Sequence, residues 1–321
     1  SFRLNSTHKI SNIFTFGQTL GYAHHKGSGL GNTNSEFGGL LSSAINLDPI
    51  TPVIITDDAV ANAAPYSVNP VVKDAMGRPY GISSIVGQEM TNPLAYIQTR
   101  LGGFNWSDDI IGNAYLEAAI TNDIKFRSTV GGKLSYWGNE GYTPVFYLNA
   151  TNQTLNNSYG RGANKGFGWN VENTVTYHKL FGEHNVTVLL GQGSYVENIS
   201  NSSYVTIHNL PITSYKDASF NFDIPTVDRE VSASDGTQHK ITSLFARVNY
   251  SYMEKYLFTG IIRQDGSTRF GPDKKYGYFP SFSLGWNINK EKFWANNNLV
   301  STLKLRGGYG VVGNDNLAAF R

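Results

Sequence analysis

Apolar and polar residues alternate with a period of two along much of this chain. From residue 13 to residue 22, one side of an extended backbone carries Phe14, Phe16, Leu20 and Tyr22, and the other side carries mainly threonine and glycine. From residue 124 to residue 136, the second side instead carries lysine, arginine, threonine and serine. Successive side chains of a β-strand point to opposite faces of a sheet. The pattern therefore predicts strands with one apolar face and one polar face.

The same alternation predicts about ten strands in all. They cover residues 2–10, 13–22, 113–121, 124–136, 169–177, 184–195, 244–252, 256–265, 277–289 and 302–311. Many of them have the roughly 9 to 11 residues with which a tilted strand crosses a bilayer. Tyrosine and tryptophan gather near the strand ends, where amphipathic rings favour the headgroup level of a membrane. The pattern thus favours a membrane-spanning sheet over a soluble one.

Short and long connections alternate between these strands, as they do in outer-membrane barrels with their short periplasmic turns and long extracellular loops. Only the last two connections, 266–276 and 290–301, are of comparable length. The expected extracellular loops span about 25–112, 138–166 and 196–240. We therefore predict an all-β fold, a transmembrane antiparallel β-barrel whose polar positions face inward and whose apolar positions face lipid.

Composition agrees with this fold and excludes several functions. Charged residues make up 16% of the chain, aromatic residues 13%, and 34 positions are glycine, which favours strands and turns over long helices. The net charge of +2 lacks the basic footprint of a nucleic-acid-binding protein. Cysteine is absent, which removes disulfides, thiolate metal sites and cysteine nucleophiles. The first residues lack the features of a signal peptide, so we expect the chain to begin inside a longer protein.

One polar cluster invites a functional interpretation. Arg263, Asp265, Gly266 and Arg269 form an Asp-Gly turn signal flanked by arginines, which would suit a carboxylate or a sugar. We favour a structural ion pair that closes the turn. The later ligand positions of an EF-hand do not follow Asp265, so no calcium site is predicted there.

Other candidate sites receive little support. His24 and His25 are neighbours in a strand and point to opposite faces, so no metal is predicted there, and no cofactor anywhere. The pairs Asp57–Asp58 and Asp108–Asp109 are expected in loops, without partners that would indicate a glycosidase. No G-x-S-x-G signature is present, so we do not expect an enzyme.

Several motifs go beyond alternation. They are R-x-D-G-S-x-R-F at 263–270, Y-F-P-S at 278–281, W-N-x-x-x-E-x-F at 286–293 and L-K-L-R-x-x-Y-G at 303–310. The stretch WNVENTVTYHKLFGEHNVTVLLGQ at 169–192 adds a W-x-x-E-N-T-x-T-Y strand and a short turn. These motifs resemble those of the SusC/RagA family of TonB-dependent outer-membrane transporters. Residues 25–112, with NLDPITPV and NPLAYI, are similar to the large early loop of that family.

The resemblance implies a nutrient importer in the outer membrane of a Gram-negative bacterium. Its barrel would have about 22 strands, of which residues 1–321 supply part. Its substrate would be an oligosaccharide or a peptide, and its partners a SusD-like surface lipoprotein, the TonB complex and the lipid of the outer membrane. No plug domain, TonB box or last strand is recognised in this chain. The alternative is a surface adhesin or glycan-binding β protein that transports nothing.

The alternation and the expected loops give candidate contact residues within such a transporter. Inward charged positions are expected to line the lumen, where hydrating the wall or docking the plug is favoured over touching the substrate: Lys125, Arg127, Lys133, Glu172, Arg247, Arg263 and Arg306. Loop aromatic residues would stack on sugar rings, meet the lid protein, or simply pack the loops: Trp106, Tyr142, Tyr147 and Tyr159.

Overall fold

The computed structural model describes residues 1–30, 39–86, 90–271, 274–294 and 300–315. One antiparallel sheet of 11 strands dominates it, in the order β1-β2-β3-β4-β7-β8-β10-β11-β12-β13, with β9 paired to β8. The strands are β1 (Phe2–Lys9), β2 (Phe14–Gly27), β3 (Gly103–Ala119), β4 (Ile124–Thr143), β7 (Ser158–Phe181), β8 (His184–His208), β9 (Arg229–Asp235), β10 (His239–Tyr252), β11 (Tyr256–Ser267), β12 (Tyr276–Asn287) and β13 (Lys304–Gly310).

Neighbour order in this sheet follows chain order, apart from β9 and the small separate hairpin of β5 (Phe146–Tyr147) and β6 (Gln153–Thr154). Such an up-and-down meander is the topology of membrane barrels. Every strand that the alternation predicts is present, and the all-β antiparallel fold is confirmed.

The strands on the loop side run further than their alternation indicates. β4 has 20 residues, β7 has 24 and β8 has 25, well beyond the roughly 9 to 11 needed to cross a bilayer. The expected loops 25–112, 138–166 and 196–240 therefore shrink to the connections 28–102, 144–157 and 209–228. Beyond the bilayer no lipid selects apolar residues on the outer face, so a strand continues there without its strongest sequence signal.

Among the strands of the described 11-stranded sheet, β9 alone is not predicted from the sequence. It lies within the expected 196–240 loop and pairs with the outer half of β8, from Asn201↔Asp235 to Ile207↔Arg229. Its seven residues are all exposed. So short a segment, without an apolar face to bury, carries almost no periodic signal.

The register places polar and apolar side chains on opposite faces, as predicted. Across one row, Thr15 opposes Glu117, Glu117 opposes Arg127 and Arg127 opposes Thr174. A row of the other face consists of Tyr22, Ile110, Leu134 and Phe167. We call these the polar face and the apolar face. Large apolar side chains stand exposed on the apolar face, where only lipid would cover them: Leu20, Leu116, Val130, Leu190 and Leu284.

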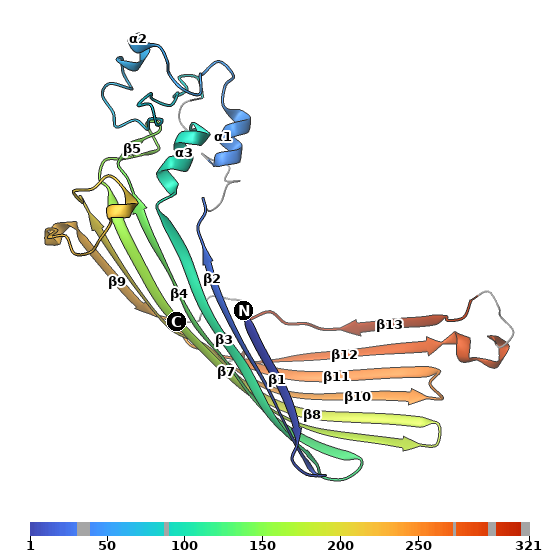
Figure 1. Ribbon diagram of the computed structural model, residues 1–321. Coiled ribbons are helices and arrows are strands. Elements are labelled where there is room, and N and C mark those ends of the chain that lie inside the picture. The colour runs from blue at the N-terminus through green and yellow to red at the C-terminus, as the bar shows by residue number, and fades with distance from the viewer. Residues whose placement is uncertain (31–38, 87–89, 272–273, 295–299, 316–321) are drawn as a thin grey trace.

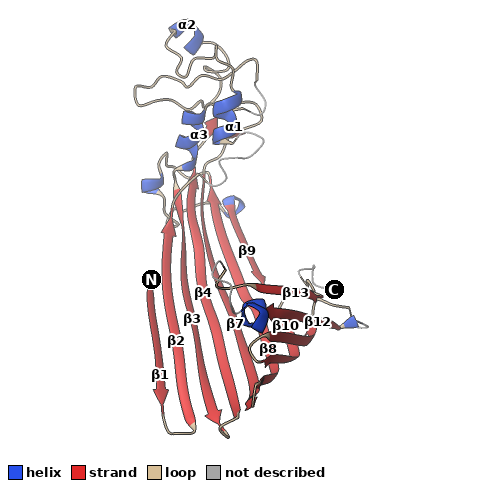
Figure 2. Ribbon diagram, turned by 90° about the vertical axis from the view of Figure 1, so that its right-hand side faces the viewer, coloured by secondary structure: helices blue, strands red, loops and turns tan. Residues whose placement is uncertain are grey.

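The sheet is strongly curved, and its loop side carries a small helical cap. Figure 1 shows β2, β3, β4 and β7 rising toward the helices, whereas β10 to β13 are turned across them. Figure 2 shows the cap standing above the ends of these strands. It contains α1 (Leu40–Asn46), α2 (Asp58–Ala61) and α3 (Pro93–Arg100). None of the helices in the described part of the chain is long and apolar enough to span a membrane.

The buried clusters lie on the loop side of the sheet, in the connections and at the outer ends of β4, β7 and β8. One cluster is formed by Tyr142, Tyr159, Ile207, Leu210 and Ile224, under the 209–228 connection with its 3-10 helices η1 (Tyr215–Asp217) and η2 (Thr226–Asp228). A second cluster joins the cap to the β5–β6 hairpin. Two further 3-10 helices, η4 (Ile288–Lys290) and η5 (Lys292–Trp294), follow β12 on the short-turn side. A membrane wall needs no buried apolar layer of its own, because lipid takes that place.

Candidate functional site

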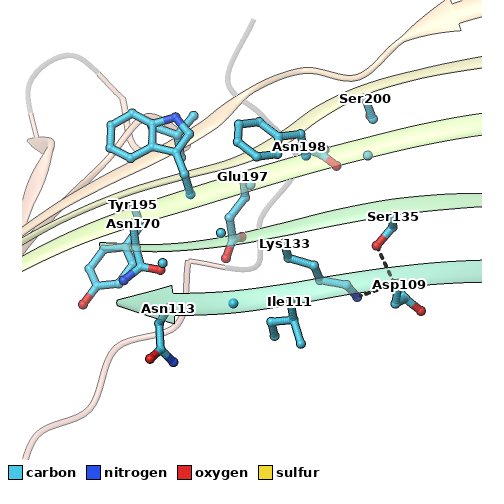
Figure 3. Close-up of a pocket in the computed structure, with 18 of the residues that line it drawn as sticks. Asp109, Ile111, Asn113, Lys133, Ser135, Asn170, Tyr195, Glu197, Asn198 and Ser200 are labelled. Carbon is cyan, nitrogen blue, oxygen red and sulfur yellow. Dashed lines mark hydrogen bonds and ion pairs between the residues drawn. The ribbon is translucent and has the colours of Figure 1, made fainter. Parts of the chain in front are cut away.

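A hollow of the sheet lies on the polar face, over β3, β4, β7 and β8. It has a volume of about 740 Å³, and we call it the wall hollow. Figure 3 shows polar side chains from neighbouring strands gathered around it. The residues labelled there are the apolar Ile111 and the polar Asp109, Asn113, Lys133, Ser135, Asn170, Tyr195, Glu197, Asn198 and Ser200.

A β-bulge shapes one side of the wall hollow. The register of β7 with β8 shifts between Phe167 and Trp169, because β8 contains one extra residue at this point. Asn198 has a φ of 64°, a left-handed conformation that asparagine tolerates better than most residues. In a regular strand Tyr195 and Ser200 would point to opposite faces, since five positions separate them. The extra residue returns Ser200 to the polar face.

The charges of the wall hollow are largely paired. Lys133 Nζ lies 3.2 Å from Asp109 Oδ1, and Ser135 Oγ donates to the same oxygen at 2.5 Å. Glu197 Oε2 lies 3.6 Å from Nδ1 of the buried His239. Just beyond the hollow, Tyr195 Oη donates to Glu172 Oε2 at 3.0 Å. The hollow is therefore polar without a large net charge.

All seven predicted lumen residues lie on the polar face. Arg127 Nη2 is 2.7 Å from Glu117 Oε2, and Lys125 Nζ is 3.7 Å from the second oxygen of the same carboxylate. Arg306 lines a smaller hollow of about 440 Å³ at the other end of the sheet, beside Lys304. Arg247 is paired with Ile261 of β11, which is in turn paired with Ser281 of β12. The structure thus places these side chains together on one surface but not in one cluster.

The Asp-Gly segment is a strand and not a turn, so the expected turn is wrong. β11 continues to Ser267, and Asp265 and Gly266 oppose Gly277 and Tyr276 of β12. The ion pair is present, since Arg263 Nε lies 2.8 and 2.7 Å from the two oxygens of Asp265. Arg269 does not join it and donates to the backbone oxygen of Asp315 at 3.3 Å. Pairing with β12 keeps this segment extended despite its glycine.

The loop aromatic residues pack the loops and are poorly placed for ligand. Tyr159 is 2% exposed and its ring lies 4.6 Å from that of Phe220. Tyr142 is 6% exposed and donates to the backbone oxygen of Ile212 at 3.1 Å. Tyr147 belongs to the β5–β6 hairpin. Trp106 lies in β3 and opposes Gly138 on the apolar face. Trp106, Tyr142 and Tyr159 were expected in loops because the outer parts of β3, β4 and β7 were not predicted.

A carboxylate network ties the 209–228 connection to the outer end of β4. Tyr215 Oη donates to Glu140 Oε1 at 3.0 Å, and Arg161 Nη2 lies 2.9 Å from Glu140 Oε2. Burial and the hydrogen bond to Glu140 raise the pKa of Tyr215 to about 12. Burial opposes ionisation of Glu140, but hydrogen bonds from Tyr159 and Tyr215 and the charge of Arg161 hold its pKa below the usual value. Glu140 lies in β4 beyond residues 124–136, the segment predicted to cross the membrane.

The remaining residues that the sequence suggested as metal or catalytic sites do not come together in one site. His24 Nδ1 lies 2.8 Å from Asp108 Oδ1 on the apolar face, whereas His25 points to the other side. Asp108 and Asp109 were expected in a loop, but they lie in β3, so this expectation is wrong. Asp57 caps α2 by accepting from the backbone N–H of Ala59. No group of three metal-ligating side chains forms within the described residues.

The curated relatives found by comparison with known proteins are TonB-dependent receptors. No protein-family model matches the chain. The chain is 30% identical to TonB-dependent receptor P39 of Formosa agariphila over 234 residues, which are 71% of this chain and 22% of that receptor. It is 28% identical to TonB-dependent receptor SusC of Bacteroides thetaiotaomicron over 298 residues, which are 89% of this chain and 27% of SusC. The chain spans about a quarter of the length of the curated relatives it matches.

Solved structures show the same fold at lower identity. The RagAB peptide transporter aligns with a TM-score of 0.67 at 16% identity, over 99% of this chain and 33% of that one. The RagAB peptide importer in its open-open state aligns with a TM-score of 0.69 at 17% identity, over 99% of this chain and 32% of that one. At this identity the likeness establishes the fold of the wall alone.

Proposed function

The chain belongs to the SusC/RagA-type TonB-dependent receptors of the outer membrane, and from that premise we propose that it forms part of the wall of a nutrient importer. Its relatives are receptors and not enzymes. The imported substrate would be an oligosaccharide or a peptide, moved with energy supplied through TonB. A SusD-like surface lipoprotein would close the extracellular side.

One observation carries this proposal: the same sheet has a continuous polar face with hollows and an opposite face of exposed apolar side chains. In an outer-membrane barrel, outward positions meet lipid and inward positions line an aqueous or plugged lumen. A surface adhesin would need the apolar face for membrane anchoring but has no use for hollows on the inner wall. A transporter has a use for both.

The outer ends of the strands support a partner above the barrel. The cap around α1 to α3 and the 209–228 connection have their own buried clusters, so they form ordered surfaces. The RagAB structures are described as a peptide importer in open-open and closed-closed states. We propose a corresponding lid on this receptor.

Uptake in living cells tests the proposal. The gene that encodes this chain is deleted, and growth and accumulation are measured with labelled oligosaccharides and labelled peptides as candidate nutrients. The importer predicts loss of uptake of at least one class in the deletion strain and in a strain without TonB. Binding that persists at the surface without TonB, together with unchanged uptake of every nutrient, would instead establish the adhesin.

A further inference from the structure

We propose that the outer part of the polar face, on β4, β7, β8 and β9, is a binding track for a neutral oligosaccharide, with Trp137 and Tyr204 as its stacking surfaces. The inference rests on the proposed function, because it requires substrate to pass along this wall. It deepens that function by choosing between its two substrate classes.

Trp137 lies flat against the wall. A side-chain carbon at Gly166 would stand 2.9 Å from Cζ3 and 3.2 Å from Cη2 of the indole, so the ring covers bare backbone at this glycine. Trp137 is still 39% exposed. Among the described residues, no cation and no second ring covers its other side. Within the described residues, one face of the indole therefore rests on the wall, and the other carries neither a ring nor a cation.

Tyr204 repeats this arrangement further from the membrane. Side-chain carbons at Gly162 and Gly160 would stand 2.9 Å from its Cδ2 and 2.5 Å from its Oη, so this ring also lies over glycine backbone. It too is 39% exposed. The 209–228 connection packs on the opposite face of the sheet, around Tyr159 and Ile207, and leaves the side of Tyr204 open.

Two other aromatic residues of the polar face, Tyr115 and Phe245, have a guanidinium over the ring. Arg127 Cζ stands 4.2 Å from the ring centre of Tyr115, and Arg263 Cζ stands 5.6 Å from that of Phe245. A guanidinium over a ring occupies the negative face that a ligand would use. Tyr115 is therefore a natural control for Trp137.

Neutral polar groups surround the two open rings. Tyr204 lines an upper hollow of about 300 Å³, whose described lining consists of amide, hydroxyl and backbone groups, including Asn139, Asn164, Ser202 and Ser234. Asn164 Nδ2 donates to the backbone oxygen of Trp137 at 3.1 Å, and Ser202 and Ser234 share a hydrogen bond of 2.8 Å. In the adjoining wall hollow, Lys133 is neutralised by Asp109.

This chemistry suits a neutral sugar better than a peptide or an anionic glycan. The C–H faces of a pyranose ring stack on the negative face of an aromatic ring, and sugar hydroxyls both donate to and accept from amides and serines. A sulfated or uronic sugar would require unpaired cations, which this part of the face does not offer among the described residues. A peptide would require partners for charged side chains and extended backbone.

Binding by the whole receptor tests the track. The full-length receptor that contains this chain is purified in detergent and applied to an array of neutral oligosaccharides, uronic and sulfated oligosaccharides, and peptides of mixed sequence. We expect retention of neutral oligosaccharides. Trp137→Leu and Tyr204→Leu should each weaken that binding roughly five- to tenfold, whereas Tyr115→Leu should change it less than twofold.

Two further variants separate stacking from folding. Gly166→Ala keeps the tryptophan but tilts it from the wall, so it should weaken binding, and Trp137→Phe should restore part of the affinity lost in Trp137→Leu. Heat-dependent mobility in gel electrophoresis confirms that each variant barrel is folded. Retention of only peptides or anionic glycans, retention of nothing, or equal losses for Trp137→Leu and Tyr115→Leu would each overturn the track. TonB-dependent uptake of peptides would leave the importer standing while removing the track.

Discussion

Each side chain of this sheet meets either lipid or the aqueous lumen, and the face of the sheet from which it projects decides between the two. Val248 opposes Val188 and Gly260 on the apolar face, in the middle of the predicted membrane-crossing segment 244–252 of β10. Its neighbour Asn249 opposes Thr187 and Thr259 on the polar face. A charge on the lipid face near mid-bilayer costs about 2–4 kcal/mol, and a charge in the lumen costs little.

We therefore expect Val248→Arg to destabilise the folded receptor by about 2–4 kcal/mol, with Asn249→Arg as the matched control near zero. Urea unfolding of the receptor in lipid vesicles measures both. Equal losses for the two variants would refute the assignment of the faces. Cysteines at the same positions offer a second check, since water-soluble reagents should label position 249 and spare position 248.

In the cap, a carboxylate organises a loop. Thr51 donates to Asp48 through its backbone N–H at 2.8 Å and its hydroxyl at 2.9 Å, and Ser83 donates to the same carboxylate. These hydrogen bonds, that of Ser83 first, hold the pKa of Asp48 below its ordinary value. A lowered folded-state pKa means that the stabilisation is present above the ordinary pKa and is lost as the pH falls through the lowered one.

Hydrogen exchange tests this pH dependence. The protection factor of the Thr51 amide should be high at pH 7 and fall as Asp48 becomes protonated in strongly acidic solution. In Asp48→Asn the protection should be low at both pH values, while Asp74→Asn should leave Thr51 unaffected. A protection factor for Thr51 that does not change with pH in the parent receptor would contradict the role of the carboxylate.

At the scale of elements, the outer halves of β7 and β8 depend on one bulge. Without the extra residue near Asn198, Ser200, Ser202 and Tyr204 would turn to the opposite face. The left-handed backbone of Asn198 costs a β-branched residue about 1–2 kcal/mol, and glycine nothing.

We accordingly expect Asn198→Val to destabilise the β7–β8–β9 region by about 1–2 kcal/mol and Asn198→Gly to be tolerated. Limited proteolysis within the 209–228 connection, which this region supports, reports the loss locally. Faster cleavage in both variants, or in neither, would show that the conformation of residue 198 does not set the register.

At the scale of the whole molecule, the sheet has two outer strands, β1 and β13, each paired on one side within the described residues. Unpaired backbone groups are not tolerated in lipid, so a membrane wall must close on itself. About 22 strands enclose the lumen of the larger outer-membrane transporters. The 11 strands seen here need further strands to complete such a wall.

Residues 1–321 produced alone should therefore fail to form a stable barrel in lipid vesicles. The expected result is the absence of the heat-dependent gel mobility that marks folded outer-membrane barrels, with the full-length receptor as the positive control. A heat-sensitive folded band from the isolated chain would show that its two outer strands pair with each other or with a second copy.

Much of this protein follows from its sequence alone. Alternation locates ten of the 11 strands of the described sheet, because lipid on one side and a wet lumen on the other impose opposite residue types at successive positions. The same rule places Lys125, Arg127 and Glu172 on the polar face. Specific motifs then indicate the family, which the relatives confirm.

Only the tertiary structure decided what happens outside the bilayer and across strands. It extended β7 and β8, added β9, buried Tyr142 and Tyr159, and turned the Asp265–Gly266 segment into strand. It also showed which rings of the polar face are covered and which, at Trp137 and Tyr204, stay open. Alternation shows which side chains of one strand face water and which face lipid. These features depend instead on the register between strands that are far apart in the chain, and a single sequence carries no local signal for that register.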